Sequence, residues 1–265
     1  MTSTVRSKDG TSIAFDRVGT GPAVILVDGA LCHRKMGPMG PLAQVLAPHF
    51  TVYTYDRRGR GESGHTEPYA IAREVEDLQA VITAAGGSAL VCGVSSGAVL
   101  ALEAAQRGVS MRKLALYEAP CIVDDTRTPL PEDYLSRLID MIARNRRGEA
   151  VKYFMAAVQV PKVFVWLMSV LPSWKGLKAT APTLVHDMTL LDGLQRGQPL
   201  PAHRWSTVRV PTLVMDGGKS PAWMRNAQRA LAAVVPGATT RTLPGQTHMV
   251  KATVLGPALV EFFTE

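Results

Sequence analysis

The stretch that decides the fold is residues 89–101, which read ALVCGVSSGAVLA. Its apolar start is typical of a buried strand, and its end opens a helical pattern that runs to residue 107. Between the two, residues 93–97 match the spacing G-x-S-x-G, which places Ser95 on a tight strand-to-helix turn. At such a turn the free N–H groups of the helix N-terminus favour a developing negative charge. This context predicts that Ser95 is a nucleophile on a nucleophile elbow.

Outward from this stretch, short apolar runs alternate with segments of helical spacing. The expected strands are 23–27, 51–56, 89–93, 113–118, 210–215 and a short one at 241–243, and the expected helices are 71–85, 98–107, 222–234 and 253–263. Such alternation predicts right-handed βαβ units, a mainly parallel twisted sheet and helices on both of its faces. Asp9-Gly10 lies between two strand-like segments, so we expect a hairpin and an antiparallel start to the sheet.

Residues 121–207 break this alternation, because they contain helical patterns, seven prolines and no convincing strand. We therefore predict an α/β core formed by residues 1–120 and 208–265, with a helical cap of residues 121–207 inserted after the sixth strand. The cap contains an unusually apolar stretch, residues 163–174. Extra core packing is one interpretation of this insertion. A lid over a site is favoured, because loops at the C-terminal edge of such a sheet usually carry function.

Composition narrows the class of protein. The chain has 265 residues, of which 46% are hydrophobic and 19% charged, so it is long and apolar enough to bury its own core. Three cysteines without a CxxC pair argue against a disulfide framework or a thiolate zinc site, and they fit a reducing, cytoplasmic compartment. The histidines lack metal-ligand spacing, and no G-x-G-x-x-G follows a first strand. We expect no metal and no cofactor.

The net charge is +7, but the basic residues are interpreted as dispersed, with short runs only at 57–60 and 144–147. No nucleic-acid recognition motif accompanies them. The N-terminus lacks an apolar secretory segment, and no stretch approaches the about 20 apolar residues of a membrane span. We therefore expect neither a nucleic acid nor a membrane as a partner, and either a monomer or a homodimer.

A serine nucleophile needs a base, and the best-placed histidine is His248. It lies in the late loop PGQTH (244–248), where the chain order serine, acid, histidine requires it. His33 follows the first loop, where it could contact a ligand. The other four histidines are interpreted as loop or surface residues: His49, His65, His186 and His203.

The base needs a carboxylate to orient it, and the sequence offers two. Where an acid usually follows the strand 210–215, the chain has Ser220, which cannot hold an imidazolium. Asp216 lies four residues earlier, at the end of the strand itself. Glu118 ends the strand KLALYE (113–118), from which a carboxylate can also reach the histidine loop. We favour Glu118, with Asp216 as the alternative acid.

Two backbone N–H groups should form an oxyanion hole. One belongs to Ser96, after the nucleophile, and the other to Ala30, with Gly29 as a less favoured donor in the same loop. The substrate pocket is expected to include apolar residues of the cap and residues beside the catalytic loops. These residues are Leu31, His33, Met155, Trp166 and Met249.

Several motifs together resemble the α/β-hydrolase family, and the resemblance covers nearly the whole chain outside 121–207. They are GVSSG at 93–97, YDRRGRGES at 55–63, VPTLVMDGG at 210–218 and GQTH at 245–248. The second is similar to the family's D-x-R-G-x-G-x-S loop, whose role there is mainly structural. The resemblance implies the α/β-hydrolase fold.

The chain departs from the family pattern at two positions. Asp28-Gly29 replaces the usual His-Gly of the oxyanion loop, and Ser220 replaces the late aspartate. Both departures resemble the fungal zearalenone-lactonase type of enzyme, which also has an S-S-G-A elbow and takes its acid from a Glu-x-Pro after the sixth strand. Ser95, Glu118 and His248 match that pattern, which supports Glu118 as the acid.

The sequence thus predicts a cofactor-independent serine hydrolase that cleaves an apolar carboxylic ester or lactone through an acyl-enzyme. A cap rich in tryptophan, methionine, leucine and valine favours such a substrate over a charged one. A carbon–carbon bond hydrolase of diketone-type substrates remains an alternative, as does a ligand-binding protein without turnover. Perhydrolase and thioesterase activities are lesser alternatives. Ser95 argues against dehalogenases and epoxide hydrolases, which use an aspartate nucleophile.

Overall fold

A computed structural model describes residues 2–265 and contains one eight-stranded sheet in the order β1-β2-β4-β3-β5-β6-β7-β8. The strands are β1 (Ser3–Arg6), β2 (Ser12–Val18), β3 (Ala23–Val27), β4 (Thr51–Tyr55), β5 (Ala89–Val94), β6 (Met111–Tyr117), β7 (Thr212–Gly217) and β8 (Thr239–Leu243). β2 pairs antiparallel with β1 and β4, and all other neighbours are parallel. The predicted hairpin and the mainly parallel sheet are confirmed.

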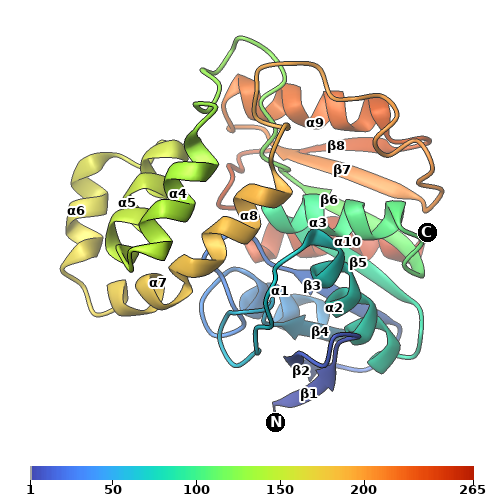
Figure 1. The fold of residues 1–265 in the computed structure, drawn as a ribbon. Coiled ribbons are helices and arrows are strands. Elements are labelled where there is room, and N and C mark those ends of the chain that lie inside the picture. Colours follow the sequence, from blue (N-terminus) through green and yellow to red (C-terminus); the bar gives the residue numbers. More distant parts are fainter. Residues whose placement is uncertain (1) are drawn as a thin grey trace.

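Five helices cover the two faces of the sheet (Figure 1). They are α1 (Met39–Leu46), α2 (Ile71–Ala84), α3 (Ser96–Gln106), α9 (Ala222–Val234) and α10 (Ala252–Thr264). Side chains alternate along each strand, so Val24 and Leu26 of β3 pack with α1 and α10, whereas Ile25 and Val27 pack with α2 and α3. The sheet is therefore buried on both faces, which explains the continuous apolar runs of β3 and β5.

Helix α1 was not predicted from the sequence. Its buried residues Met39, Leu42, Ala43 and Leu46 have helical spacing, but Gly40-Pro41 interrupts the pattern. Proline is tolerated there because it lies in the first turn, where its missing N–H breaks no intrahelical bond.

Between β6 and β7 the chain forms only helices and loops within the described residues. The helices are α4 (Tyr134–Ala143), α5 (Arg147–Ala157), α6 (Lys162–Ser169), α7 (Trp174–Thr180), a short 3₁₀ helix (Ala181–Thr183) and α8 (Leu184–Leu190). Helices α4 to α7 form a lobe beside the sheet, and α8 leads from it back to α2 and α3 (Figure 1). We refer to this helical segment as the cap; its function as a lid stays a prediction.

The carboxyl ends of β3, β5, β6 and β7 meet at one edge of the sheet, because these strands are parallel neighbours. Asp28, Ser95 and Glu118 each follow one of these strands directly. Ligands of open α/β sheets bind at this edge. Among residues 2–265, no helix combines the length and the apolarity needed to cross a bilayer.

Candidate active site

Ser95 occupies a strained turn between β5 and α3. Its backbone has φ 58° and ψ −129°. This conformation is strained for any residue that has a β-carbon. The flanking glycines permit the turn. A β-carbon on Gly93 would lie 2.4 Å from the Gly97 carbonyl oxygen, and one on Gly97 would lie 2.3 Å from that of Val27. The G-x-S-x-G spacing is therefore a packing requirement, which holds Ser95 half-buried at the N-terminus of α3.

Glu118 and His248 form a hydrogen-bonded pair at the same sheet edge. His248 Nδ1 lies 2.9 Å from Glu118 Oε2, and the Gly217 N–H donates to Glu118 Oε1 at 2.8 Å. Glu118 is fully buried, whereas the His248 side chain is 40% exposed. A carboxylate accepts a hydrogen bond from Nδ1–H, so Nε2 is left as the basic nitrogen of the imidazole.

The loop that carries His248 is fixed to the ends of β6 and β7. The Tyr117 hydroxyl donates to the Thr247 carbonyl at 2.6 Å, and the Lys219 N–H donates to the Gln246 carbonyl at 2.8 Å. The Gln246 side chain in turn accepts a hydrogen bond from the Lys251 N–H at 3.0 Å. Sequence reasoning did not assign Tyr117 or Gln246 a role, although each lies within two residues of a candidate catalytic residue.

The structure does not bring the alternative acid to the histidine. Asp216 is buried at the end of β7, and no hydrogen bond within residues 2–265 joins it to His248. Ser220, in the position of the usual late aspartate, is also buried. Its hydroxyl has no hydrogen-bond partner among the described residues.

The loop after β3 lies against the elbow. A β-carbon on Gly29 would be 2.9 Å from Ser95 Cβ, so only glycine allows this approach. Arg60 Nη1 donates to the Gly29 carbonyl at 2.5 Å. In a trans peptide the next N–H, that of Ala30, points away from that carbonyl. Neither this N–H nor that of Ser96 has an acceptor among residues 2–265.

A buried carboxylate of the cap, Asp187 on α8, connects the two arginines of the loop 56–63 with Ser96 of the elbow. Its Oδ2 accepts from Arg60 at 2.6 Å, and its Oδ1 accepts from Arg57 at 2.7 Å and from the Ser96 hydroxyl at 2.7 Å. Arg57 also contacts the Asp28 carbonyl at 3.3 Å. Burial would raise the pKa of Asp187, but Arg60 and Arg57 outweigh that effect and hold it below its ordinary value.

The loop 56–63, interpreted from the sequence as mainly structural, also contacts the loop after β3 beside Ser95. Arg57 and Arg60 bind the carbonyls of the oxyanion loop directly. Asp187 had no signal in the sequence, because its partners lie 130 and 127 residues away along the chain.

Asp28 is a buried acid with an unsatisfied oxygen. It is 3% exposed, and its Oδ1 has no hydrogen-bond partner among residues 2–265. Burial raises its pKa to about 7, against the attraction of Arg60 and Arg57. The neighbouring thiol of Cys32 has its pKa raised to about 12, by burial and by the charge of Asp28.

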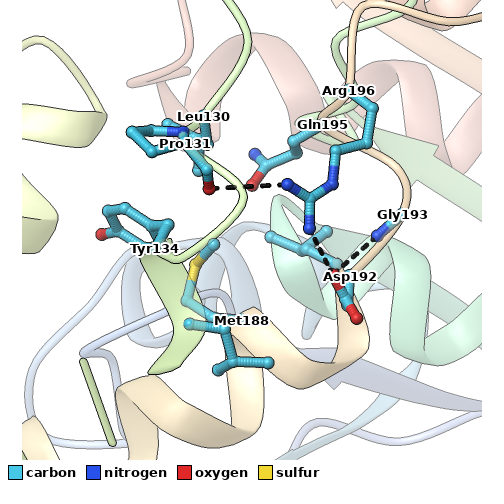
Figure 2. A pocket seen from close by; sticks show the side chains of 10 residues that line it. Leu130, Pro131, Tyr134, Met188, Asp192, Gly193, Gln195 and Arg196 are labelled. Carbon is cyan, nitrogen blue, oxygen red and sulfur yellow. Dashed lines mark hydrogen bonds and ion pairs between the residues drawn. The ribbon is translucent and has the colours of Figure 1, made fainter. Parts of the chain in front are cut away.

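The structure places the expected substrate-pocket residues in different degrees of burial. Leu31 is buried beside the oxyanion loop, His33 is half-buried with its backbone paired to Met36, and Met155 packs against the core. Trp166 and Met249 are 65% and 80% exposed. Neither Trp166 nor Met249 lines the pocket between α4 and the loop after α8 (Figure 2). Arg196 borders this pocket, where it donates hydrogen bonds to Asp192 and to the Pro131 carbonyl.

The interpretation of His186 as a loop or surface residue is wrong. It lies buried on α8, and its ring stacks on Tyr69 at 3.9 Å and on His65 at 5.0 Å between centroids. Burial lowers its pKa to about 4. Among residues 2–265 no group of three or more His, Cys, Asp or Glu is arranged to hold a metal ion.

Comparison with known proteins decides the family. The model of the alpha/beta hydrolase family matches residues 24–253. The chain belongs to this family. An alpha/beta hydrolase from Sphaerobacter thermophilus, known from its crystal structure, is 51% identical over 98% of this chain and 100% of its own, with a TM-score of 0.90. The family and the fold expected from the sequence motifs are confirmed.

Two further relatives of this alpha/beta hydrolase carry more specific names. A pimeloyl-[acyl-carrier protein] methyl ester esterase of Xanthomonas campestris is 37% identical over 106 residues. The match covers 40% of this chain and 40% of that relative's length. An esterase from Exiguobacterium antarcticum is 19% identical over the whole of both chains, with a TM-score of 0.71, and shows the fold alone.

Proposed function

We propose that this alpha/beta hydrolase is a cofactor-independent serine hydrolase that cleaves carboxylic esters or lactones of apolar small molecules. The observation that carries the proposal is the Glu118–His248 hydrogen bond at the sheet edge where Ser95 follows β5. A histidine oriented by a carboxylate, at the same sheet edge as a serine on a strained turn, is the arrangement that activates a hydroxyl.

In the proposed reaction His248 Nε2 takes the Ser95 proton while Oγ attacks the substrate carbonyl. Glu118 stabilises the imidazolium and holds Nδ1 in the protonated tautomer. His248 then gives its proton to the leaving alcohol, and an acyl-enzyme remains. A water molecule, deprotonated by the same histidine, attacks the acyl carbon and releases the acid and the free serine.

The developing oxyanion would accept hydrogen bonds from the Ala30 and Ser96 N–H groups. Fixed donors of this kind are effective because they need no reorganisation when the charge appears. The Arg60–Gly29 contact supports the choice of Ala30, since it orients the peptide group between Gly29 and Ala30. Gly29 N–H is the less favoured donor, because it lies close enough to the Asp28 carboxylate to lower the pKa of that group.

The ester specificity is supported from two directions. A relative that matches 40% of the chain is named as a methyl ester esterase. The departures at Asp28 and Ser220, together with Glu118 as the acid, resemble zearalenone-lactonase-type enzymes, which supports lactones within the same chemistry. Esters and lactones both react through an acyl-enzyme, so the site residues have the same roles with either substrate.

A panel of p-nitrophenyl esters of graded chain length and of aryl and alkyl lactones tests the proposal, with Ser95→Ala as the matched control. We expect turnover of at least one apolar ester or lactone by the wild type and none above background by Ser95→Ala. Products of a 1,3-diketone in the same panel would reveal carbon–carbon hydrolysis. Tight binding of panel compounds without turnover would instead indicate a ligand-binding protein and contradict the proposal.

A further inference from the structure

The exposed apolar side chains of this protein gather on one part of the cap. Nine large hydrophobic residues in the part described, residues 2–265, are exposed, and seven of them fall between residues 158 and 171. These seven are Val158, Val163, Phe164, Trp166, Leu167, Val170 and Leu171. Contiguous exposed apolar surface of this kind marks an interaction site on a folded protein. We call these seven residues the apolar tip.

Helix α6, which carries most of the apolar tip, is apolar around its whole circumference. It reads KVFVWLMS, and Val165 is its one buried residue. A helix that is hydrophobic on all sides is normally enclosed by protein or by lipid. Here α6 lies at the outer edge of the cap lobe, far from the sheet (Figure 1), so protein covers only its inner side. Its outer side lacks the covering that its sequence requires.

Basic residues flank the apolar tip in the sequence. Residues 144–178 contain seven lysines and arginines and one acidic residue, a net charge of +6 where the whole chain carries +7. The excess of positive charge therefore lies in this segment, although 22 of the 29 basic residues are dispersed over the rest of the chain, where 21 acidic residues balance them. An open groove between α5 and α7 collects five of the segment's seven basic residues: Arg146, Arg147, Lys152, Lys175 and Lys178.

Most of this charge is not neutralised within the protein. Arg146 pairs with Glu149, and Arg144 pairs with Asp140. The other five, Arg147 and the four lysines of 144–178, form no ion pair within the described residues. A partner of this surface must therefore supply negative charge as well as an apolar environment.

Against the expectation from the sequence that no membrane is a partner, we propose that the apolar tip and the basic groove beside it form a docking surface for an anionic lipid membrane. The apolar side chains of α6 would enter the boundary between headgroups and acyl chains, as the apolar face of an interfacial helix does. The unpaired lysines would contact anionic headgroups, and their long stems let the ammonium groups stay in the polar layer. Trp166 has the amphipathic ring typical of this boundary.

Two other occupants fit the surface less well. A second copy of the chain would bring the same +6 segment opposite itself, because a two-fold interface pairs a patch with its own equivalent. An acidic protein would satisfy the charge, but charge alone leaves the outer side of α6 uncovered. An anionic membrane meets both demands. The inference does not depend on the proposed catalytic function, since it rests on the cap alone.

Vesicle binding tests the proposal on the full chain, with Trp166 as a built-in reporter. Trp166 is 65% exposed, whereas the other three tryptophans, Trp174, Trp205 and Trp223, are buried. Vesicles of phosphatidylcholine alone are compared with vesicles that contain phosphatidylglycerol, at low and high salt. We expect co-sedimentation and a blue shift of the tryptophan emission with the anionic vesicles only. Added salt should weaken the binding.

Three variants separate the apolar contribution to vesicle binding from the electrostatic one. Val163→Ser with Phe164→Ser removes apolar contacts and keeps the reporter, so binding should fall at least about tenfold. Lys175→Glu with Lys178→Glu reverses charge and should abolish the preference for anionic vesicles. The matched control is Ile139→Ser, on α4, which is similarly exposed but outside the apolar tip and should leave binding unchanged. Melting temperatures close to that of the wild type verify that each variant is folded.

Three results would overturn the proposal. The first is absence of binding to anionic vesicles at low salt by the folded wild type. The second is binding that survives the Val163→Ser, Phe164→Ser change, since the attraction would then be electrostatic only. The third is a stable dimer in sedimentation equilibrium that the same change dissociates, because a second copy would then be the occupant of the apolar tip.

Discussion

At the residue scale, the candidate site depends on backbone conformations that side chains rarely adopt. Ser95, Glu118 and Leu31 all have positive φ values, of 58°, 48° and 60°. Each such residue costs of order 1–3 kcal/mol and persists only where its surroundings hold it. Ser95 and Glu118 directly follow parallel strands and Leu31 lies in the loop after β3, so all three lie at the sheet edge where we propose that the chemistry takes place.

The two candidate acids should differ sharply in their effect on turnover. Glu118→Gln keeps the shape of the side chain but removes the charge that orients His248, so we expect kcat to fall by about 10³–10⁴. Asp216→Asn should lower kcat only modestly, because no hydrogen bond joins Asp216 to the histidine. Steady-state kinetics on one ester decides between them, and the reverse order of effects would contradict the assignment of Glu118.

Asp28 should make stability fall as pH rises. The pKa of Asp28 is about 7 in the folded protein against an ordinary value of 3.8, so the folded state holds this proton more tightly. Its stabilising contribution is complete below pH 4 and is lost as pH rises to about 7. Asp28→Asn cannot titrate. Relative to the wild type, the variant should therefore gain about 3 kcal/mol in free energy of unfolding between pH 5 and pH 8.

Urea unfolding of both proteins at several pH values measures this gain. Altered hydrogen bonding also changes the unfolding free energy of the variant by an amount that does not depend on pH. The comparison across pH values removes this constant amount. A difference in unfolding free energy that stays the same from pH 5 to pH 8 would mean that Asp28 is ionised throughout.

At the scale of elements, the cap is joined to the sheet edge that carries Ser95 by a carboxylate shared between two arginines. Asp187→Asn removes the charge that positions Arg60 and Arg57 against the oxyanion loop. We expect kcat to fall about 10- to 100-fold with little change in KM, since a displaced donor acts mainly in the transition state. Trifluoromethyl ketone affinity should weaken in proportion to kcat/KM, whereas affinity for a substrate-like ground-state ligand should not.

Asp77→Asn is the matched control for this change. Asp77 is also buried and accepts two hydrogen bonds from Arg58, the residue next to Arg57, but it lies on α2 and, within the described residues, has no hydrogen bond to the loop after β3. Both variants should lose stability, because each removes the charge of a buried carboxylate that is paired with a buried arginine. Equal loss of kcat in the two variants would show that Asp187 acts through stability alone.

His186 connects α8 of the cap with the loop around Tyr69, and it should weaken the fold in acid. Its pKa is lowered by burial from 6.5 to about 4, so the unfolded chain takes up a proton that the folded protein refuses. The stability that this histidine contributes above pH 6.5 is lost as pH falls toward 4, by about 3 kcal/mol.

His186→Phe keeps the ring that stacks on Tyr69 and cannot be protonated. Its free energy of unfolding should therefore decline less than that of the wild type between pH 7 and pH 4.5. Chemical denaturation at these two pH values measures the decline, and identical declines in the two proteins would contradict the assignment of an acid-sensitive contact to His186.

At the scale of the whole molecule, features that depend on neighbouring residues in the sequence could be predicted, and features that depend on contacts between distant segments could not. The elbow and the strands 23–27 and 89–93 depend on local patterns, so their positions were predictable. The partnership of Glu118 with His248 was predictable as one of two alternatives, because strand order brings the ends of β6 and β7 close to the histidine loop. The choice between the two acids needed side-chain geometry.

The features that escaped prediction depend on contacts between distant segments. Asp187 and His186 acquire their roles only when α8 packs against the loops 56–63 and 65–69. The apolar stretch 163–174 is as hydrophobic as core sequence, and nothing within it distinguishes an outward face from a buried one. The cap is thus the part of the molecule in which sequence reasoning was least informative, both for the site and for the surface.

The most direct test of the central claim, an activated Ser95, is labelling with a fluorophosphonate followed by intact-mass measurement. We expect one adduct on the wild type, none on Ser95→Ala, and labelling of Glu118→Gln that is slower by orders of magnitude. An unlabelled wild type that is shown to be folded, or a label that persists on Ser95→Ala, would contradict this claim.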